Sequence, residues 1–92
     1  MSITIIGGNE CMERRYIDLC KEYNCKAKIF TKPKGINSKM GRPDMVVLFT
    51  NTVSHKMINI ALAAVNADST KIVRSHSSSL SSLKEILNTH VS

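Results

Sequence analysis

Short apolar runs alternate with longer amphipathic stretches along the chain, which is the pattern of an α/β fold. Runs rich in Ile, Val, Leu and Phe are typical of buried strands. They predict strands at Ile3–Ile6, Ala27–Phe30, Met45–Phe49 and Ile72–Val73. Apolar residues spaced three and four apart predict three helices, over residues 10–24, 57–65 and 80–87.

The order of these elements predicts a small three-layer domain, Rossmann-like or flavodoxin-like, that occupies residues 1–92 as one unit. Its sheet would have four parallel strands in the order 2-1-3-4, joined by right-handed crossovers and covered by three helices. The link between the second and third strands lacks helical patterning, and two prolines and two glycines interrupt it. We therefore expect residues 31–43 to form a loop with at most one helical turn, placed as a flap over a site.

Composition narrows the class of protein. With 42% hydrophobic residues but only two Tyr and two Phe, the core must be mainly aliphatic, and a homodimer would bury more of the surface. The start of the chain does not resemble a signal peptide and no apolar stretch reaches membrane-spanning length, so we expect a cytoplasmic protein with no membrane partner. The chain has three cysteines, Cys11, Cys20 and Cys25, and no two of them form a CxxC motif. This favours reduced thiols over a disulfide framework or a zinc site.

The charge of the chain indicates an anionic partner. The formal net charge is +6, with thirteen Lys and Arg residues against seven acids. Residues 31–43 concentrate this charge, because Lys32, Lys34, Lys39 and Arg42 occur there without an acid. Charge alone does not distinguish a nucleotide or another phosphorylated small molecule from a nucleic acid.

Two Ser-His pairs stand where a predicted strand ends and a predicted helix begins. They are Ser54-His55 and Ser75-His76. Strand-to-helix turns in α/β proteins meet at one edge of the sheet, so these pairs are expected to face one crevice. This shared position is the strongest indication of a site in the sequence.

Two further features would complete the crevice. In the first turn, Gly7 and Gly8 allow a ligand close to the backbone, and Asn9 can cap the following helix, although the dinucleotide fingerprint is absent. The serine-rich run 75–82 has two interpretations: its hydroxyls cap the last helix, or they bind an oxyanion together with Arg74. Both interpretations remain open.

We take the residues of these turns as a candidate anion-binding site. Arg15 is included because it lies at the flank of the apolar stripe of the first helix, where it could reach the crevice or a partner subunit. The candidate ligand-binding residues are Gly7, Gly8, Asn9, Arg15, Ser54, His55, Arg74, Ser75, His76 and Ser77, and the flap would add Lys32, Lys34, Lys39 and Arg42.

Templates for catalysis fit these positions poorly. Cys11 follows the first turn as a phosphatase cysteine could, but Ile17 stands where resemblance to those enzymes requires an arginine. The third strand ends without a phosphoacceptor aspartate, and no acid accompanies the Ser-His pairs to complete a triad or a metal site. These observations favour binding over catalysis and give no reason to expect a metal.

Several short motifs together resemble a known family. They are Ile-Gly-Gly near the start, Met-Glu-Arg-Arg-Tyr at 12–16, Thr-Asn-Thr-Val-Ser-His at 50–55 and Val-Arg-Ser-His-Ser-Ser-Ser-Leu at 73–80. As a set they resemble the small bacterial family known as domain of unknown function 2325, over nearly the whole chain. The resemblance implies a bacterial domain of uncharacterised activity. It supports grouping Gly7, Gly8, Arg15, Ser54, His55, Arg74 and Ser75 in one site.

Three functional hypotheses follow. The first is a non-catalytic domain that binds a nucleotide or phosphorylated metabolite at the carboxyl edge of the sheet. The second is a nucleic-acid-binding module that uses the basic loop, although aromatic residues for base stacking are scarce. The third is a haem-binding or redox-sensing module that uses His55, His76 or Met57 with a cysteine.

Overall fold

The computed structural model describes residues 1–65 and 68–91. All strands of its sheet are parallel and lie in the order β2-β1-β3-β4, as the sequence predicts. The strands are β1 (Ser2–Ile6), β2 (Lys26–Phe30), β3 (Met45–Phe49) and β4 (Lys71–Ser75). The predicted α/β fold is therefore confirmed, and the Rossmann-like label fits its topology.

Four helices accompany the sheet instead of the three expected. They are α1 (Glu13–Glu22), α2 (Ile36–Lys39), α3 (His55–Ala64) and α4 (Leu80–His90), and a 3-10 turn, η1 (Glu10–Met12), precedes α1. The additional helix, α2, is the single turn allowed for within residues 31–43. In the described residues, no helix is both long and apolar enough to cross a membrane.

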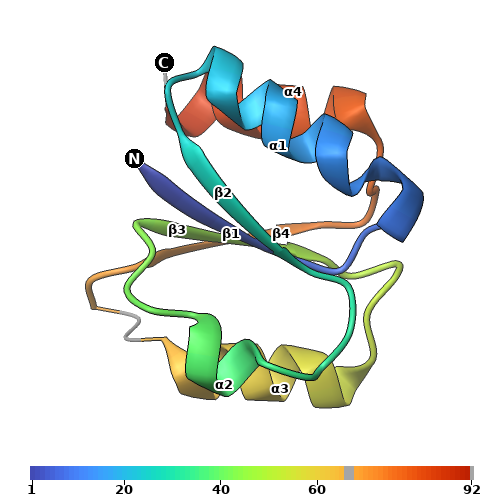
Figure 1. Ribbon diagram of the computed structural model, residues 1–92, viewed down its shortest axis with the longest axis vertical. Helices are drawn as coiled ribbons and strands as arrows, with labels where there is room; N and C mark the ends of the chain where they lie inside the picture. Colours follow the sequence, from blue (N-terminus) through green and yellow to red (C-terminus); the bar gives the residue numbers. More distant parts are fainter. Residues whose placement is uncertain (66–67, 92) are drawn as a thin grey trace.

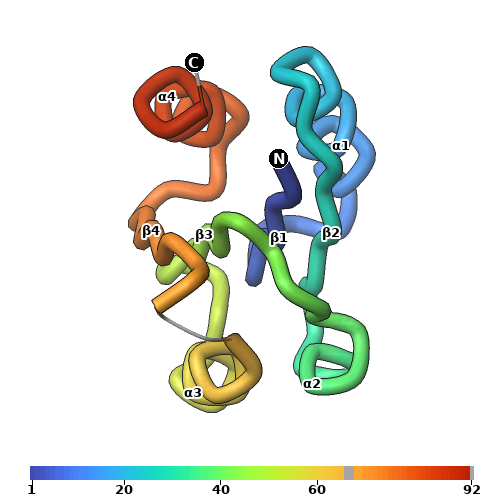
Figure 2. Tube along the Cα trace, turned by 90° about the vertical axis from the view of Figure 1, so that its left-hand side faces the viewer, coloured from blue at the N-terminus to red at the C-terminus, as the bar shows by residue number. Residues whose placement is uncertain are grey.

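The helices form two layers, with α1 and α4 on one face of the sheet and α2 and α3 on the other (Figures 1 and 2). Strand β3 runs through the middle, and all five of its residues are buried. Such a strand reads as an unbroken apolar run because helices cover both of its faces.

Alternation of side chains along the strands creates two cores. Ile5 and Val47 pack beneath α1 and α4 with Tyr16, whereas Ile6 and Leu48 pack on the α2 and α3 side. Successive residues of a strand point to opposite faces, so each central strand contributes to both layers. The two cores hold the ends of the central strands in a fixed position, and these ends carry the turns of the candidate site.

The basic segment is anchored to the second core. Ile36 is fully buried and Met40 is 2% exposed, although both belong to the segment expected to act as a flap. Gly35 precedes α2 with a φ of 87°, which starts the helical turn from a left-handed residue. Opening residues 31–43 as a flap would therefore expose two buried side chains to water.

Candidate anion-binding edge

The turns that follow the four strands lie along one edge of the sheet and are bonded to one another in sequence across it. At the β2 end, Gly7 N donates to Phe30 O (2.8 Å). Between β1 and β3, Gly8 N donates to Thr52 Oγ1 (2.7 Å). Between β3 and β4, Thr50 Oγ1 donates to Ser75 O (3.1 Å). The carboxyl edge is thus a continuous polar network, although the hydrogen bonds that build it are largely internal.

Atoms of the protein itself fill the space beside the two glycines of the first turn. Gly7 has a φ of +101°, and a Cβ at this position would lie 2.4 Å from Val53 Cγ1 and 2.9 Å from Thr52 Oγ1. At Gly8, a Cβ would lie 2.8 Å from Cε2 of Tyr16. The β1–β3 boundary is the topological switch point, where ligands enter many open α/β sheets. Here Thr52 and Val53 occupy that position.

Asn9 and the three serines expected to bind an anion cap helices or turns. Ser54 Oγ accepts from Met57 N (3.2 Å) at the start of α3, and Asn9 Oδ1 accepts from Cys11 N (3.0 Å) at η1. Ser75 Oγ donates to Ser77 O (2.8 Å), and Ser77 Oγ accepts from Ser79 N (3.3 Å). At the start of α4, Ser79 Oγ accepts from Ser82 N (3.2 Å), so capping is the interpretation of the serine-rich run that the described contacts display.

The two histidines lie at the same edge but in different environments. His55 is the first residue of α3 and is exposed. His76 is exposed too, and its Nδ1 lies 3.2 Å from Thr50 Oγ1. Because that hydroxyl already donates to Ser75 O, it can accept a hydrogen from Nδ1 of His76. The neutral ring would then carry its proton on Nδ1 and present Nε2 to solvent as an acceptor.

The two Ser-His turns lead in opposite directions. The turn at Ser54-His55 continues into α3 on one face of the sheet, and the turn at Ser75-His76 continues toward α4 on the other (Figure 1). Among the described residues, no hydrogen bond joins one pair to the other. Both pairs lie at the carboxyl edge, and Thr50 Oγ1 joins the turn after β3 to Ser75 O.

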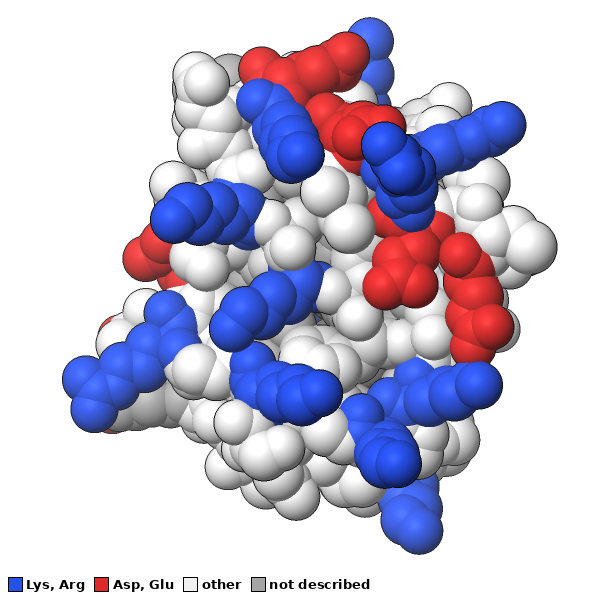
Figure 3. Space-filling model, in the orientation of Figure 1, with Lys and Arg blue, Asp and Glu red and all other residues white. Residues whose placement is uncertain are grey.

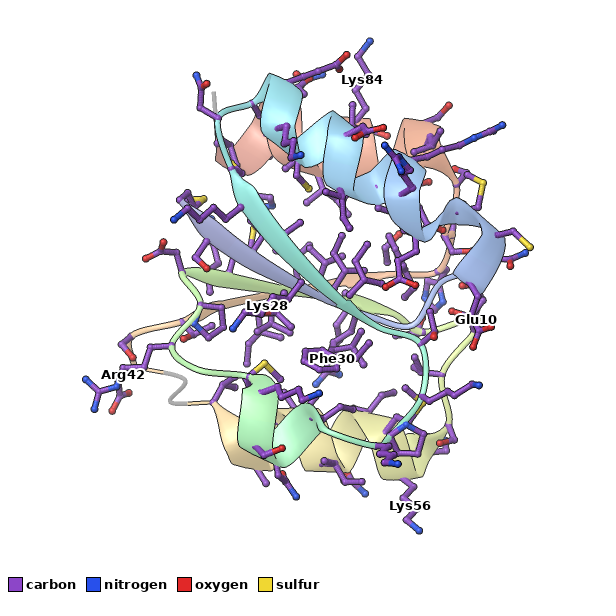
Figure 4. The ribbon with its side chains drawn as sticks, in the orientation of Figure 1. Glu10, Lys28, Phe30, Arg42, Lys56 and Lys84 are labelled. Atoms are coloured by element: carbon purple, nitrogen blue, oxygen red, sulfur yellow. The ribbon has the colours of Figure 1, made fainter. Side chains whose placement is uncertain are left out.

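The predicted cations are divided between opposite ends of the molecule. Lys32 follows β2 at the carboxyl edge, where its Nζ lies 3.2 Å from a carboxylate oxygen of Glu10. Arg42 lines a hollow at the amino edge together with Asp44, and Figure 4 shows Arg42 and Glu10 at opposite ends of the sheet. The α2 turn causes this division, because it carries the chain back along the sheet toward the start of β3.

Arg15 lies on α1, toward the first residues of α4. It lines a hollow of about 290 Å³ between α1 and α4, with Leu19 and Leu80 among its neighbours. Arg74, in contrast, is exposed near the carboxyl end of β4, in register with Leu48. Arg74 therefore lies near the proposed edge, whereas Arg15 lines the groove between the two helices.

Sequence reasoning missed three residues that organise the edge. Thr50 and Thr52 bridge neighbouring turns, and the Tyr16 hydroxyl donates to Ser78 O (2.6 Å). Thr50 directly follows the fully buried strand β3, and Thr52 lies two residues further on, positions that could have indicated a bridging role. The position of Tyr16 gave no such signal, because an aromatic residue in the apolar stripe of a helix is predicted to be an ordinary core residue.

The histidines and cysteines do not assemble a metal site. No group of three His, Cys, Asp or Glu residues within the described ranges could hold a metal ion. Cys20 and Cys25 are buried and Cys11 is exposed, all as free thiols. Met57, a suggested haem ligand, is only 5% exposed and packs in the core beside α2. Ligation through Met57 would require the core to open.

The burial of Cys20 predicts selective thiol chemistry. Burial, with a smaller contribution from Cys25, raises the pKa of Cys20 from 9.0 to about 11. We expect iodoacetamide at pH 8 to label Cys11 in the folded protein and to reach the buried pair only after denaturation, because the thiolate is the nucleophile. Peptide mass mapping measures this selectivity, and labelling of Cys20 at the rate of Cys11 would contradict it.

The same shift gives stability a pH dependence. The pKa of Cys20 is higher in the folded chain than that of an exposed thiol, so the unfolded chain ionises first as the pH rises. The contribution of the neutral thiol to stability is complete below pH 9.0 and decreases as the pH approaches about 11. Urea unfolding of the wild type and of Cys20→Ala between these pH values measures the effect, because only the wild type should lose this part of its free energy of unfolding as the pH rises.

Comparison with known proteins identifies one relationship. A family model described as an uncharacterized protein conserved in bacteria (DUF2325) matches residues 2–90. No curated protein and no solved structure gives a significant match.

Proposed function

The chain belongs to this uncharacterised bacterial family, DUF2325, and from that premise we propose that it binds a small anion at the carboxyl edge of its sheet. The anion would be a phosphate group, carried by a nucleotide or another phosphorylated metabolite. The family description names no ligand, so support for the proposal comes from the charge and geometry of the edge.

The sign of the charge at this edge carries the proposal. Among residues 7–10, 31–35, 50–56 and 74–79, the only acid is Glu10, and it is paired with Lys32. The Lys and Arg residues in these segments are Lys32, Lys34, Lys56 and Arg74, and two histidines accompany them. The edge therefore has a surplus of positive charge, which raises the local concentration of anions.

The start of α3 is the part of the edge best suited to an anion. This helix has ten residues, so the partial positive charge of its dipole is concentrated at its N-terminus. Ser54 satisfies the N–H of Met57, while the exposed side chains of His55 and Lys56 stand in the first turn. An anion there would receive backbone N–H groups and a lysine charge together.

This arrangement changes the roles expected of individual residues. Gly8 N and the hydroxyls of Ser54 and Ser75 already have hydrogen-bond partners. They support the shape of the turns, and the cations and the helix terminus provide the attraction. A binding function is favoured over catalysis because the sole acid of the turns is held by a lysine, so the histidines have no carboxylate to orient them.

Charge reversal at Lys56 tests the proposal. We expect Lys56→Glu to weaken binding of inorganic phosphate at least about fivefold, because it replaces attraction with repulsion at a helix N-terminus. Titration followed by amide NMR shifts at residues 54–57 gives the affinity. Lys84→Glu makes the same charge change on α4, at the opposite end of the molecule from Lys56 in Figure 4, and should leave affinity nearly unchanged. An equal loss in both variants, or no shift at residues 54–57, would reject the site.

A further inference from the structure

Strand β2 is an open edge of the sheet with unused backbone groups. Lys26 N donates to Met1 O and Phe30 O accepts from Gly7 N, so the backbone groups of these two residues point toward β1. Alternate residues of a strand direct their N–H and C=O to opposite sides, which turns those of Ala27 and Ile29 outward. No described residue bonds to these outward groups. An exposed row of this kind is a template for another strand.

A groove runs along this edge. It has a volume of about 550 Å³, with residues 27–30 of β2 on its floor. Ile17 and Glu13 of α1 stand on one side, and Ser38 and Lys39 of α2 stand on the other, so the acid of the groove lies on the α1 side and the lysines lie toward α2. Helices of both layers therefore border the groove. Figure 2 shows α1 and α2 on opposite sides of β2. This space suits an extended segment.

The two walls of the groove differ in chemistry. Ala27 and Ile29 pack toward the α1 core, so that side offers aliphatic contacts. Lys28 points to the other side, where its Nζ donates to Lys39 O (3.1 Å) and keeps two further N–H groups. Figure 4 shows Lys28 and Phe30 projecting toward α2. An added strand would thus meet apolar groups on one face and lysines on the other.

The surface around the groove carries a high density of positive charge. Six cations and no acid occur between Lys26 and Arg42. In Figure 3, Lys and Arg side chains spread over the part of this face formed by β2 and α2, and acidic side chains lie mainly over α1. Two aligned copies of β2 would place like charges against each other, so this edge opposes self-pairing.

We propose that β2 accepts an acidic extended segment of a partner protein as a fifth strand of the sheet. Because side chains alternate along a strand, the segment would have acidic residues toward Lys28 and Lys39 and aliphatic residues toward Ile17 and Ile29. Main-chain hydrogen bonds to Ala27 and Ile29 would supply the register. This site is separate from the start of α3, so either site can be absent without the other.

A peptide of alternating Glu and Val residues, capped at both ends and about eight residues long, is the probe. We expect it to shift the amide signals of Ala27 and Ile29 and to slow their hydrogen exchange. Ala27→Pro should weaken binding at least about tenfold, because proline removes an outward N–H and still fits an edge strand. The matched variant, Ala27→Val, changes the same side chain but keeps that N–H, so it should lose clearly less binding than Ala27→Pro.

Charge exchange provides a second test that does not depend on proline being tolerated. Lys28→Glu should lose the Glu-Val peptide and gain binding to a Lys-Val peptide, which the wild type should not bind. Three outcomes would overturn the proposal: equal binding of the Glu-Val peptide by wild type and Ala27→Pro, tighter binding of single-stranded DNA than of the peptide at the same salt, or a β2-dependent dimer in sedimentation experiments.

Discussion

Replacing Gly7 with alanine is expected to lower the free energy of unfolding by about 3–5 kcal/mol, a large part of the total for a small domain. Two costs combine at this position. A φ of +101° is unfavourable for any residue with a Cβ, and the new methyl group would meet Val53 and Thr52 well inside van der Waals contact. Relief of the overlap would separate the turns after β1 and β3, which Gly8 and Thr52 hold together.

Urea unfolding of Gly7→Ala and Gly35→Ala separates these costs. Gly35 also has a positive φ, 87°, but its added Cβ would lie 3.6 Å from the nearest atom, a methylene of Lys39. Gly35→Ala should therefore lose only about 1–2 kcal/mol, from backbone conformation. Adding Val53→Ala to Gly7→Ala should recover part of the loss. Similar losses for the two single variants would show that close packing at Gly7 is unimportant.

The second large effect is expected at Tyr16, which joins α1 to the sheet and to the turn before α4. Its ring is fully buried, and its centroid lies 5.6 Å from that of Phe49. Tyr16→Ala should cost about 3–5 kcal/mol because it removes an aromatic ring from a packed core. Tyr16→Phe keeps the ring but leaves Ser78 O without its donor, so a loss of about 1–2 kcal/mol is expected.

Tyr23→Phe is the matched control for the hydroxyl. Tyr23 donates to Asn88 Oδ1 in an exposed position, where water can replace the lost partner. Its loss should stay below about 0.5 kcal/mol. Urea midpoints give the free energies, and amide exchange at residues 77–80 reports whether the Ser78 turn loosens only when the Tyr16 hydroxyl is removed. Equal losses for the two phenylalanine variants would contradict the role assigned to the Ser78 contact.

The fold could be predicted because its signals are local. The unbroken apolar run of β3 shows that both of its faces are buried, and the three- and four-residue spacing in α4 shows which face of that helix is buried. The order of the elements along the chain then restricts the topology. Element ends were less accurate. Val65, the last residue of the helix predicted over residues 57–65, lies beyond α3 as an extended C-cap residue, because the contact of an apolar side chain does not determine where helical hydrogen bonding stops.

The candidate site was only partly predictable because it depends on contacts between residues that are far apart in the sequence. A glycine after a strand signals a close approach, but the sequence does not say that the approaching group is Val53. A serine before a helix can cap it or bind a ligand, and the geometry of the turn selects the cap. Lys32 and Arg42 belong to the same basic segment of the sequence, but the α2 turn places them at opposite ends of the sheet.

The distribution of charge also makes the molecule an electric dipole. Residues 10–22 hold four of the seven acids together with three cations, whereas residues 23–43 contain six cations and no acid. Such a field acts over roughly 8 Å at physiological ionic strength, before any contact forms. An acidic segment diffusing nearby would be drawn toward the β2 side, which raises the frequency of productive encounters. Added salt would slow that capture while leaving the escape rate nearly constant.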